Sequence, residues 1–127
     1  MNTFDRLLKT EPTLAAQLVE RVARGAKLLD ESQPGWRERI RADELAMETC
    51  DQCVLGQLYG DYATGFKEML KPFDSRVQFS SGDHGFTLRD SEQGPLRLQG
   101  QPIPRHILFR FAALAELWRR EVRRVQT

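Results

Sequence analysis

The C-terminal part of the chain carries the pattern that most restricts its fold. After Pro104, apolar residues recur at intervals of four, three, four, four and three, which is the spacing of one face of an α-helix. This stripe consists of Ile107, Phe111, Leu114, Trp118, Val122 and Val125, and is widened by Leu108 and Leu117. A helix with such a stripe has to bury it against other elements, so the pattern predicts a core of helices packed on helices.

Two earlier segments have the same helical spacing. Residues 12–30 and 54–70 each place apolar side chains on one face, and the first segment ends at the turn Ser32-Gln33-Pro34-Gly35. Two short helical pieces are also predicted. One follows Thr3, which can cap it, and the other covers Trp36 to Ile40. In the second segment Gly56 and Gly60 lie four residues apart. Because each glycine inside a helix costs about 1 kcal/mol relative to alanine, they suggest that another backbone passes close by.

The region between these helices and the last one is less regular. Val77-Gln78-Phe79 and Phe86-Thr87-Leu88 flank a polar turn that contains two glycines, and Leu96-Arg97-Leu98 lies between prolines. This pattern predicts either a small β-hairpin or an irregular insertion near residues 76–98. The fold predicted is therefore mainly α: a compact domain of three to five helices that comprises residues 1–127, within the usual size of one domain.

Composition excludes several classes of protein. Of the 127 residues 40% are hydrophobic and 29% charged, which is typical of a globular domain and not of a disordered chain. Nineteen Lys and Arg against eighteen Asp and Glu leave a net charge of +1, which disfavours a dedicated duplex-DNA binder unless the charge is segregated. No apolar run approaches the roughly 20 residues of a membrane span, and the N-terminus has no signal-peptide pattern. We therefore expect a cytoplasmic protein without a membrane contact.

A series of short motifs stands in the middle of the chain. The motifs are Arg24-Gly25-Ala26-Lys27-Leu28-Leu29-Asp30-Glu31, Pro34-Gly35-Trp36 with Ile40, then Leu45, Met47 and Cys50, and Cys53-Val54-Leu55-Gly56-Gln57-Leu58-Tyr59-Gly60 with Tyr62 and Gly65. Over residues 24–66 the chain resembles a family of small uncharacterised proteins from actinobacteria and their phages. Gly85-Phe86 and Trp118-Arg119 match late elements of that family more loosely. The resemblance implies a compact small domain of phage or accessory-gene origin, and it brings no activity with it.

The two cysteines form a Cys-x-x-Cys motif, Cys50-Asp51-Gln52-Cys53, at the start of a predicted helix. Two thiols at this spacing suit a redox pair or two ligands of a zinc ion, and a closed zinc site needs four ligands. His84 and His106 could supply the other two, as could the same motif of a second copy of the chain. A third interpretation is structural: one cysteine is buried as a small apolar residue and the other starts a helix.

Arginines gather at the end of the last predicted helix. Arg119, Arg120, Arg123 and Arg124 follow Trp118 and form a local basic patch in a chain of nearly balanced charge. Arginine binds phosphate and guanine well, so the patch is a candidate contact for a nucleic acid or for an acidic protein. Cations in the last turn also stabilise a helix, and a solvated helix end explains the same residues.

Other motifs do not assemble an active site. Gly56 to Gly60 lacks the strand and the lysine of a phosphate-binding loop, and Asp83-His84 lies in a polar turn without an evident nucleophile and oxyanion site. We predict no catalytic residues and no cofactor other than a zinc ion at the cysteines. The function predicted is a binding or regulatory module that acts through protein contacts, with a monomer slightly favoured over a homodimer. The alternatives are a zinc- or thiol-dependent module and a nucleic-acid-binding protein.

Overall fold

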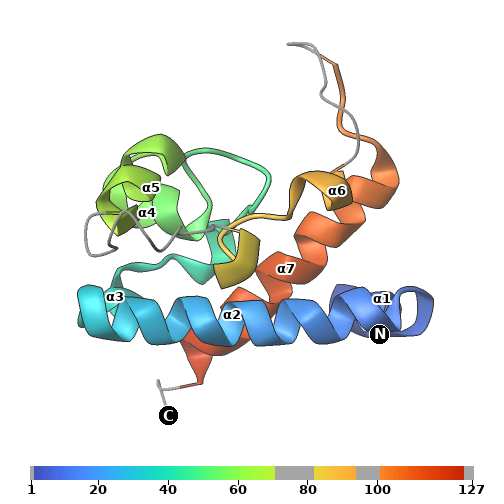
Figure 1. Ribbon diagram of the computed structural model, residues 1–127, viewed down its shortest axis with the longest axis horizontal. Helices are drawn as coiled ribbons and strands as arrows, with labels where there is room; N and C mark the ends of the chain where they lie inside the picture. Colours follow the sequence, from blue (N-terminus) through green and yellow to red (C-terminus); the bar gives the residue numbers. More distant parts are fainter. Residues whose placement is uncertain (1, 71–81, 94–100, 125–127) are drawn as a thin grey trace.

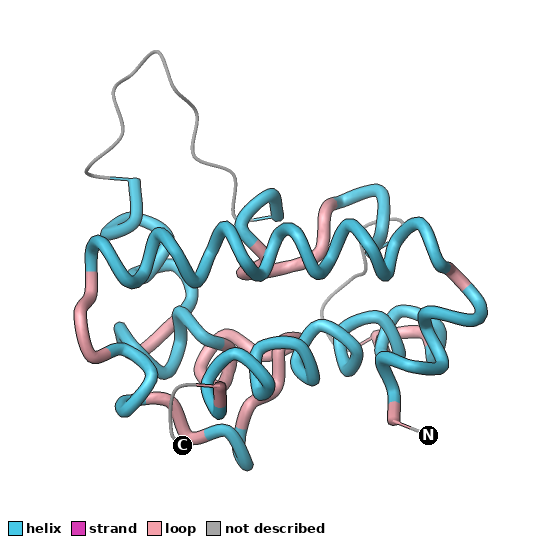
Figure 2. Tube along the Cα trace, turned by 90° about the horizontal axis from the view of Figure 1, so that it is seen from below, coloured by secondary structure: helices cyan, strands magenta, loops and turns pink. Residues whose placement is uncertain are grey.

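The computed structural model describes residues 2–70, 82–93 and 101–124, and within these ranges the chain is helical apart from short connections (Figures 1 and 2). The prediction of a mainly α fold is confirmed. The elements are α1 (Thr3–Thr10), α2 (Pro12–Ser32), α3 (Trp36–Arg39), the 3-10 turn η1 (Ala42–Glu44), α4 (Val54–Tyr59), α5 (Tyr62–Leu70), the 3-10 turn η2 (Gly82–His84), α6 (Asp90–Gln93) and α7 (Arg105–Arg123).

The core lies between the two long helices, α2 and α7, which cross in Figure 1, and α1 packs against both. The stripes predicted from spacing supply its side chains: Leu18 and Leu29 of α2 and Leu114 and Trp118 of α7 are fully buried. Leu108 departs from the prediction, because its side chain is 40% exposed on α7. Val125 lies outside the described residues.

The first helix begins one residue earlier than the sequence suggested. Asn2, and not Thr3, is the N-cap of α1, and its Oδ1 accepts a hydrogen bond of 2.8 Å from the backbone N–H of Asp5. Either residue type can cap a helix, so the sequence alone does not select between two adjacent candidates.

The segment 54–70 is not the continuous helix that its spacing predicts. It forms two helices, α4 and α5, which separate at Gly60. Gly60 adopts φ 99°, a conformation that side chains with a Cβ rarely take, and its N–H bonds to Gly56 O. The close backbone approach predicted for this segment is confirmed at Gly56, where an added Cβ would lie 2.4 Å from Cys50 O.

The β-hairpin prediction is not supported. Its first strand, residues 77–79, and the further segment 96–98 lie outside the described residues, and the residues of its second strand, Phe86 to Leu88, form an irregular connection between η2 and α6. These residues pack on the helices instead of pairing with a strand: Gly85 O accepts a hydrogen bond from Trp118, and Phe86 is fully buried. The alternative prediction of an irregular insertion near residues 76–98 fits residues 85–89, which connect η2 and α6; residues 76–81 and 94–98 lie outside the described residues.

Among the described residues, none of the helices is both long and apolar enough to cross a membrane.

Candidate functional site

Three of the motifs singled out in the sequence meet in one aromatic cluster of the core. The rings of Trp36 and Trp118 contact edge to face, with centroids 5.7 Å apart and planes at 84°. Phe86 stacks on the other side of Trp118, with centroids 5.6 Å apart. All three side chains are essentially inaccessible to solvent, so three separate motifs contribute to the packing of one cluster.

The polar atoms of both indoles have partners. Trp118 Nε1 donates to Gly85 O at 2.6 Å, and Trp36 Nε1 donates to the Asp30 carboxylate at 2.9 Å. The hydrogen bond from Trp36, with a further one from Arg37, keeps the pKa of Asp30 below its ordinary value although partial burial acts the other way. Asp30 and the Pro-Gly-Trp turn therefore have structural roles.

Gly25 lets a loop lie directly on α2. A Cβ at this position would lie 2.0 Å from His84 O and 3.0 Å from the Trp118 ring. The missing side chain allows η2 to approach the α2 backbone next to the aromatic cluster.

Gln57 lies in α4, and its side chain is hydrogen-bonded to the chain segment that precedes this helix. Its Oε1 accepts from the Arg41 backbone N–H at 2.6 Å, and its Nε2 donates to Arg41 O and Gln52 O. Together with the close approach at Gly56, these bonds give the Val-Leu-Gly-Gln motif a structural explanation.

The two cysteines have different environments. Cys53 is buried at the N-cap of α4, where its Sγ accepts a hydrogen bond of 3.3 Å from the Gly56 backbone N–H, whereas Cys50 is exposed. Burial raises the pKa of the Cys53 thiol, against the effect of the Gly56 N–H. This environment disfavours the thiolate that a nucleophile or metal ligand needs.

The two histidines lie on other elements. His84 belongs to η2, with its ring stacked 6.4 Å from that of Phe86, and His106 is exposed in the first turn of α7. Over the ranges that the structure describes, no three side chains among His, Cys, Asp and Glu lie together as a metal site would require. The structure therefore does not bring Cys50, Cys53, His84 and His106 together in one chain.

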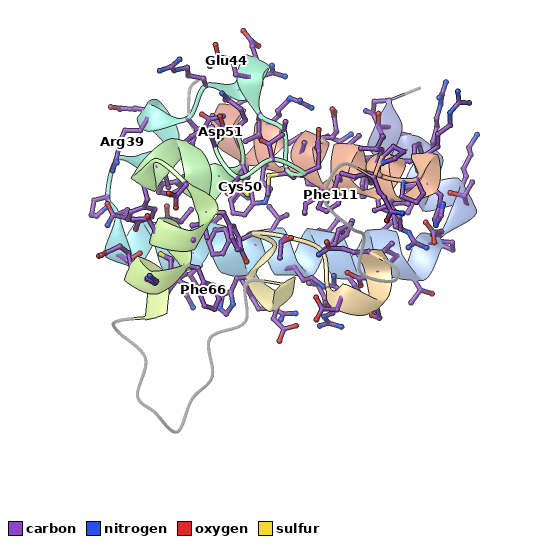
Figure 3. The ribbon with its side chains drawn as sticks, turned by 90° about the horizontal axis from the view of Figure 1, so that it is seen from above. Arg39, Glu44, Cys50, Asp51, Phe66 and Phe111 are labelled. Atoms are coloured by element: carbon purple, nitrogen blue, oxygen red, sulfur yellow. The ribbon has the colours of Figure 1, made fainter. Side chains whose placement is uncertain are left out.

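A polar cavity of about 220 Å³ lies beside the cysteine loop. Arg39, Glu44 and Asp51, which line it, are labelled above Phe66 in Figure 3. Arg39 donates to Leu58 O at 2.8 Å, and Arg41 pairs with Glu44. Arg39 and Arg41 therefore already have partners within the protein.

Two of the five predicted contact residues at the end of α7 serve the fold. Trp118 is buried in the aromatic cluster, and Arg119 donates to Ala42 O at 3.0 Å and to Leu45 O at 2.9 Å. These bonds attach η1 and the residue after it to α7. Arg120, Arg123 and Arg124 remain exposed at the surface.

The three exposed arginines line an open groove of about 600 Å³ between α2 and the C-terminal half of α7. The groove has a mostly apolar floor, formed by Val19, Val22, Ala23 and Leu117. Val19 is 46% exposed, and Leu8 and Leu108 are the other large apolar residues exposed within the described residues. Glu121 also lines the groove, and Arg37 binds its carboxylate at 2.7 Å. We call this surface the α2–α7 groove. The sequence patterns predicted its arginines and missed its apolar floor, because Val19 and Ala23 lie beside the main stripe of α2.

The groove arginines differ from the arginines that hold the fold together. Arg120, Arg123 and Arg124 pair with carboxylates at 3.5, 3.7 and 3.5 Å, and their own side chains are 45 to 75% exposed. Such exposed pairs contribute about 0–1 kcal/mol and exchange readily for other anions. Arg120 also lies over the Phe4 ring, 5.1 Å from its centroid.

Sequence reasoning missed the buried ion pair between Arg21 and Glu92. Arg21 is 1% exposed, and its two terminal nitrogens donate to the Glu92 carboxylate at 2.7 and 2.8 Å. Within the described part of the chain, Arg21 Nε has no hydrogen-bond partner. Burial raises the pKa of Glu92, but the bonds from Arg21 and the Arg89 N–H outweigh it and leave that pKa below its ordinary value. An arginine four residues after Gln17 looks like any solvated helix residue in the sequence, and its partner lies 71 residues away.

A scan against models of protein families gave no match, and searches among curated proteins and solved structures found no similar protein.

Proposed function

We propose that this chain is a small cytoplasmic module that binds another protein, and that the α2–α7 groove is its contact surface. The supporting observation is the apolar floor of the groove, where Val19 and Ala23 are exposed beside the buried Val22 and Leu117. Protein contact surfaces commonly combine an apolar centre with a polar rim and are enriched in arginine. Here Val19 supplies exposed apolar area, and Arg120, Arg123 and Arg124 stand beside it.

The open shape favours a macromolecular partner over a small molecule. Sites for small ligands usually enclose most of the ligand surface, whereas this groove is open along its length. The predicted origin among accessory genes of phage belongs to this proposal as well, since small accessory proteins without an active site act through what they bind.

Photo-crosslinking in the cells from which the chain comes tests the proposal. A photoreactive amino acid replaces Ala23 in the groove or, as a control, Ala112, which is exposed on α7 and does not line the groove. We expect a discrete protein adduct from position 23 and none from position 112. The partner, identified by mass spectrometry, is then purified and titrated with the wild-type chain.

Two matched variants decide whether that binding uses the groove. Val19→Asp removes exposed apolar area from the floor, and Leu108→Asp removes a similar area from α7 outside the groove. We expect Val19→Asp to weaken binding roughly tenfold or more and Leu108→Asp to leave it unchanged. Equal binding of both variants would contradict the proposed surface, and adducts to nucleic acid instead of protein would favour the nucleic-acid alternative.

A further inference from the structure

We infer that the α2–α7 groove receives an amphipathic helix of the partner, with acidic side chains along the edge of its apolar face. This inference rests on the proposed function and specifies the chemistry of the partner. It follows from the residues that line the groove and from the charges beside it.

The groove is bounded by one turn of α2 and about two turns of α7. Lining residues that stand three or four positions apart share one face of their helix, so each helix presents a compact strip to the groove. The lining residues are Val19, Val22 and Ala23 on α2, and Leu117, Arg120, Glu121, Arg123 and Arg124 on α7. An amphipathic helix places apolar side chains at i, i+3, i+4 and i+7, the arrangement that fills a linear apolar groove.

The charges beside the floor favour acidic residues on that helix. Three exposed arginines line the groove, while its one carboxylate, Glu121, is held by Arg37 at 2.7 Å. The present partners of Arg123 and Arg124 lie 3.7 and 3.5 Å away, so incoming carboxylates can replace them at little cost. Arginine also offers a fork of donors that fits a carboxylate with two hydrogen bonds.

The apolar floor distinguishes this occupant from a nucleic acid. Phosphate binding requires donors at the centre of the contact, where this groove has Val19, Val22 and Ala23. An acidic amphipathic helix satisfies both the floor and the arginines.

Selection from a display library of random 16-residue peptides, against the immobilised full chain, tests this inference. Peptides that also bind the Val19→Asp variant of the chain are removed, and peptides that bind the Leu108→Asp variant are kept. We expect the remaining sequences to share apolar residues at i, i+3, i+4 and i+7 and an excess of Asp and Glu beside them.

Titration of the most enriched peptide then tests the role of the arginines. We expect the double variant Arg123→Gln, Arg124→Gln to weaken binding by roughly 2- to 30-fold, with a smaller loss at high salt. The control, Arg41→Gln with Lys67→Gln, removes the same charge from exposed sites outside the groove and leaves the affinity within about twofold.

The outcomes separate the inference from the proposed function. Groove-dependent peptides without an acidic excess, or with full affinity for the double variant, would overturn the acidic helix and leave protein binding in place. Failure to enrich peptides that depend on Val19 would overturn both. A synthetic 20-nucleotide DNA or RNA strand that competes for the groove would overturn the inference in favour of a nucleic acid.

Discussion

Six arginines of this chain form two groups that differ in burial and in the lengths of their ion pairs. Arg21, Arg37 and Arg110 bind carboxylates at 2.7, 2.7 and 2.6 Å and connect elements far apart in the sequence. Arg120, Arg123 and Arg124 make longer, exposed pairs beside the groove. The first group contributes to the fold, and the second is available to a partner.

The buried pair gives the clearest prediction for a single residue. Glu92→Gln leaves the charge of Arg21 buried without its counter-ion, and we expect it to lower the free energy of unfolding by about 3–5 kcal/mol, measured by denaturant titration. Glu20→Gln, at the exposed pair with Arg24, is the matched control and should change stability by less than about 1 kcal/mol. Adding Arg21→Met to Glu92→Gln removes the unpaired charge and should recover part of the loss. Equal effects of the two glutamate variants would contradict this account of Arg21.

Gly25→Ala tests the contact between α2 and η2. Alanine is the better helix former by about 1 kcal/mol, but its Cβ would meet the His84 carbonyl. We expect the clash to dominate and to lower stability by about 1–3 kcal/mol. A rise in Tm would show that the loop does not lie against the helix at this point.

Acid should destabilise the fold through its paired carboxylates. The Arg110 hydrogen bond lowers the pKa of Glu11, and the Trp36 hydrogen bond lowers the pKa of Asp30. The pKa of Glu92 is also below its ordinary value. A carboxyl whose pKa is lower in the folded than in the unfolded chain stabilises the fold at pH values above its unfolded pKa, near 4. This contribution disappears as the pH falls through the pKa of the folded state. We therefore expect the free energy of unfolding to decrease between about pH 5 and pH 2. A constant or rising value over this interval would contradict the assignments.

The two thiols should differ in reactivity. Cys50 is exposed, while Cys53 is buried and its pKa is raised by burial. We expect iodoacetamide to modify Cys50 in the folded chain and Cys53 after unfolding in denaturant, as read by peptide mass spectrometry. Rapid modification of both thiols in the folded chain would instead support the thiol-dependent alternative.

At the scale of elements, the long helices were predictable and the interruptions were not. The spacing of Leu18, Leu29, Leu114 and Trp118 fixes the faces of α2 and α7, because a stripe must be buried whatever covers it. The break at Gly60 could not be read from spacing, because apolar residues continue across it in helical register. The conformation of residues 86–88 depends on Trp118, which lies more than thirty residues later in the sequence.

The turn at Gly60 can be compared directly with the turn at Gly35. Both glycines have positive φ, 99° and 83°, and neither has an atom within 4 Å of an added Cβ. Gly35 has ψ 9°, in the left-handed region that asparagine tolerates, whereas Gly60 has ψ −41°. We expect Gly60→Asn to cost about 1–3 kcal/mol and Gly35→Asn less than about 1 kcal/mol, by thermal unfolding. The reverse order would mean that α4 and α5 do not separate as described.

At the scale of the whole molecule, the motifs of the middle of the chain and the proposed binding surface occupy different places. Trp36, Phe86 and Trp118 join in one buried cluster and Asp30 accepts a hydrogen bond from Trp36, so these motif residues hold the fold together. The surface proposed for binding uses residues outside those motifs or beside them, such as Val19 and Arg124. The sequence could predict the arginines from their density, but the apolar floor appears only when α2 and α7 are placed side by side.

The most direct test of the central claim is an NMR titration of the ¹⁵N-labelled full chain with the partner segment identified by crosslinking or with the enriched peptide. The account predicts that backbone amide shifts concentrate at the groove, near Val19, Ala23, Leu117 and Arg120, and that Val19→Asp abolishes them at the same peptide concentration. Amides around Cys50 and Cys53 should stay unchanged. Shifts centred on the cysteine loop, or spread evenly over the chain, would contradict the claim that the α2–α7 groove is the binding surface.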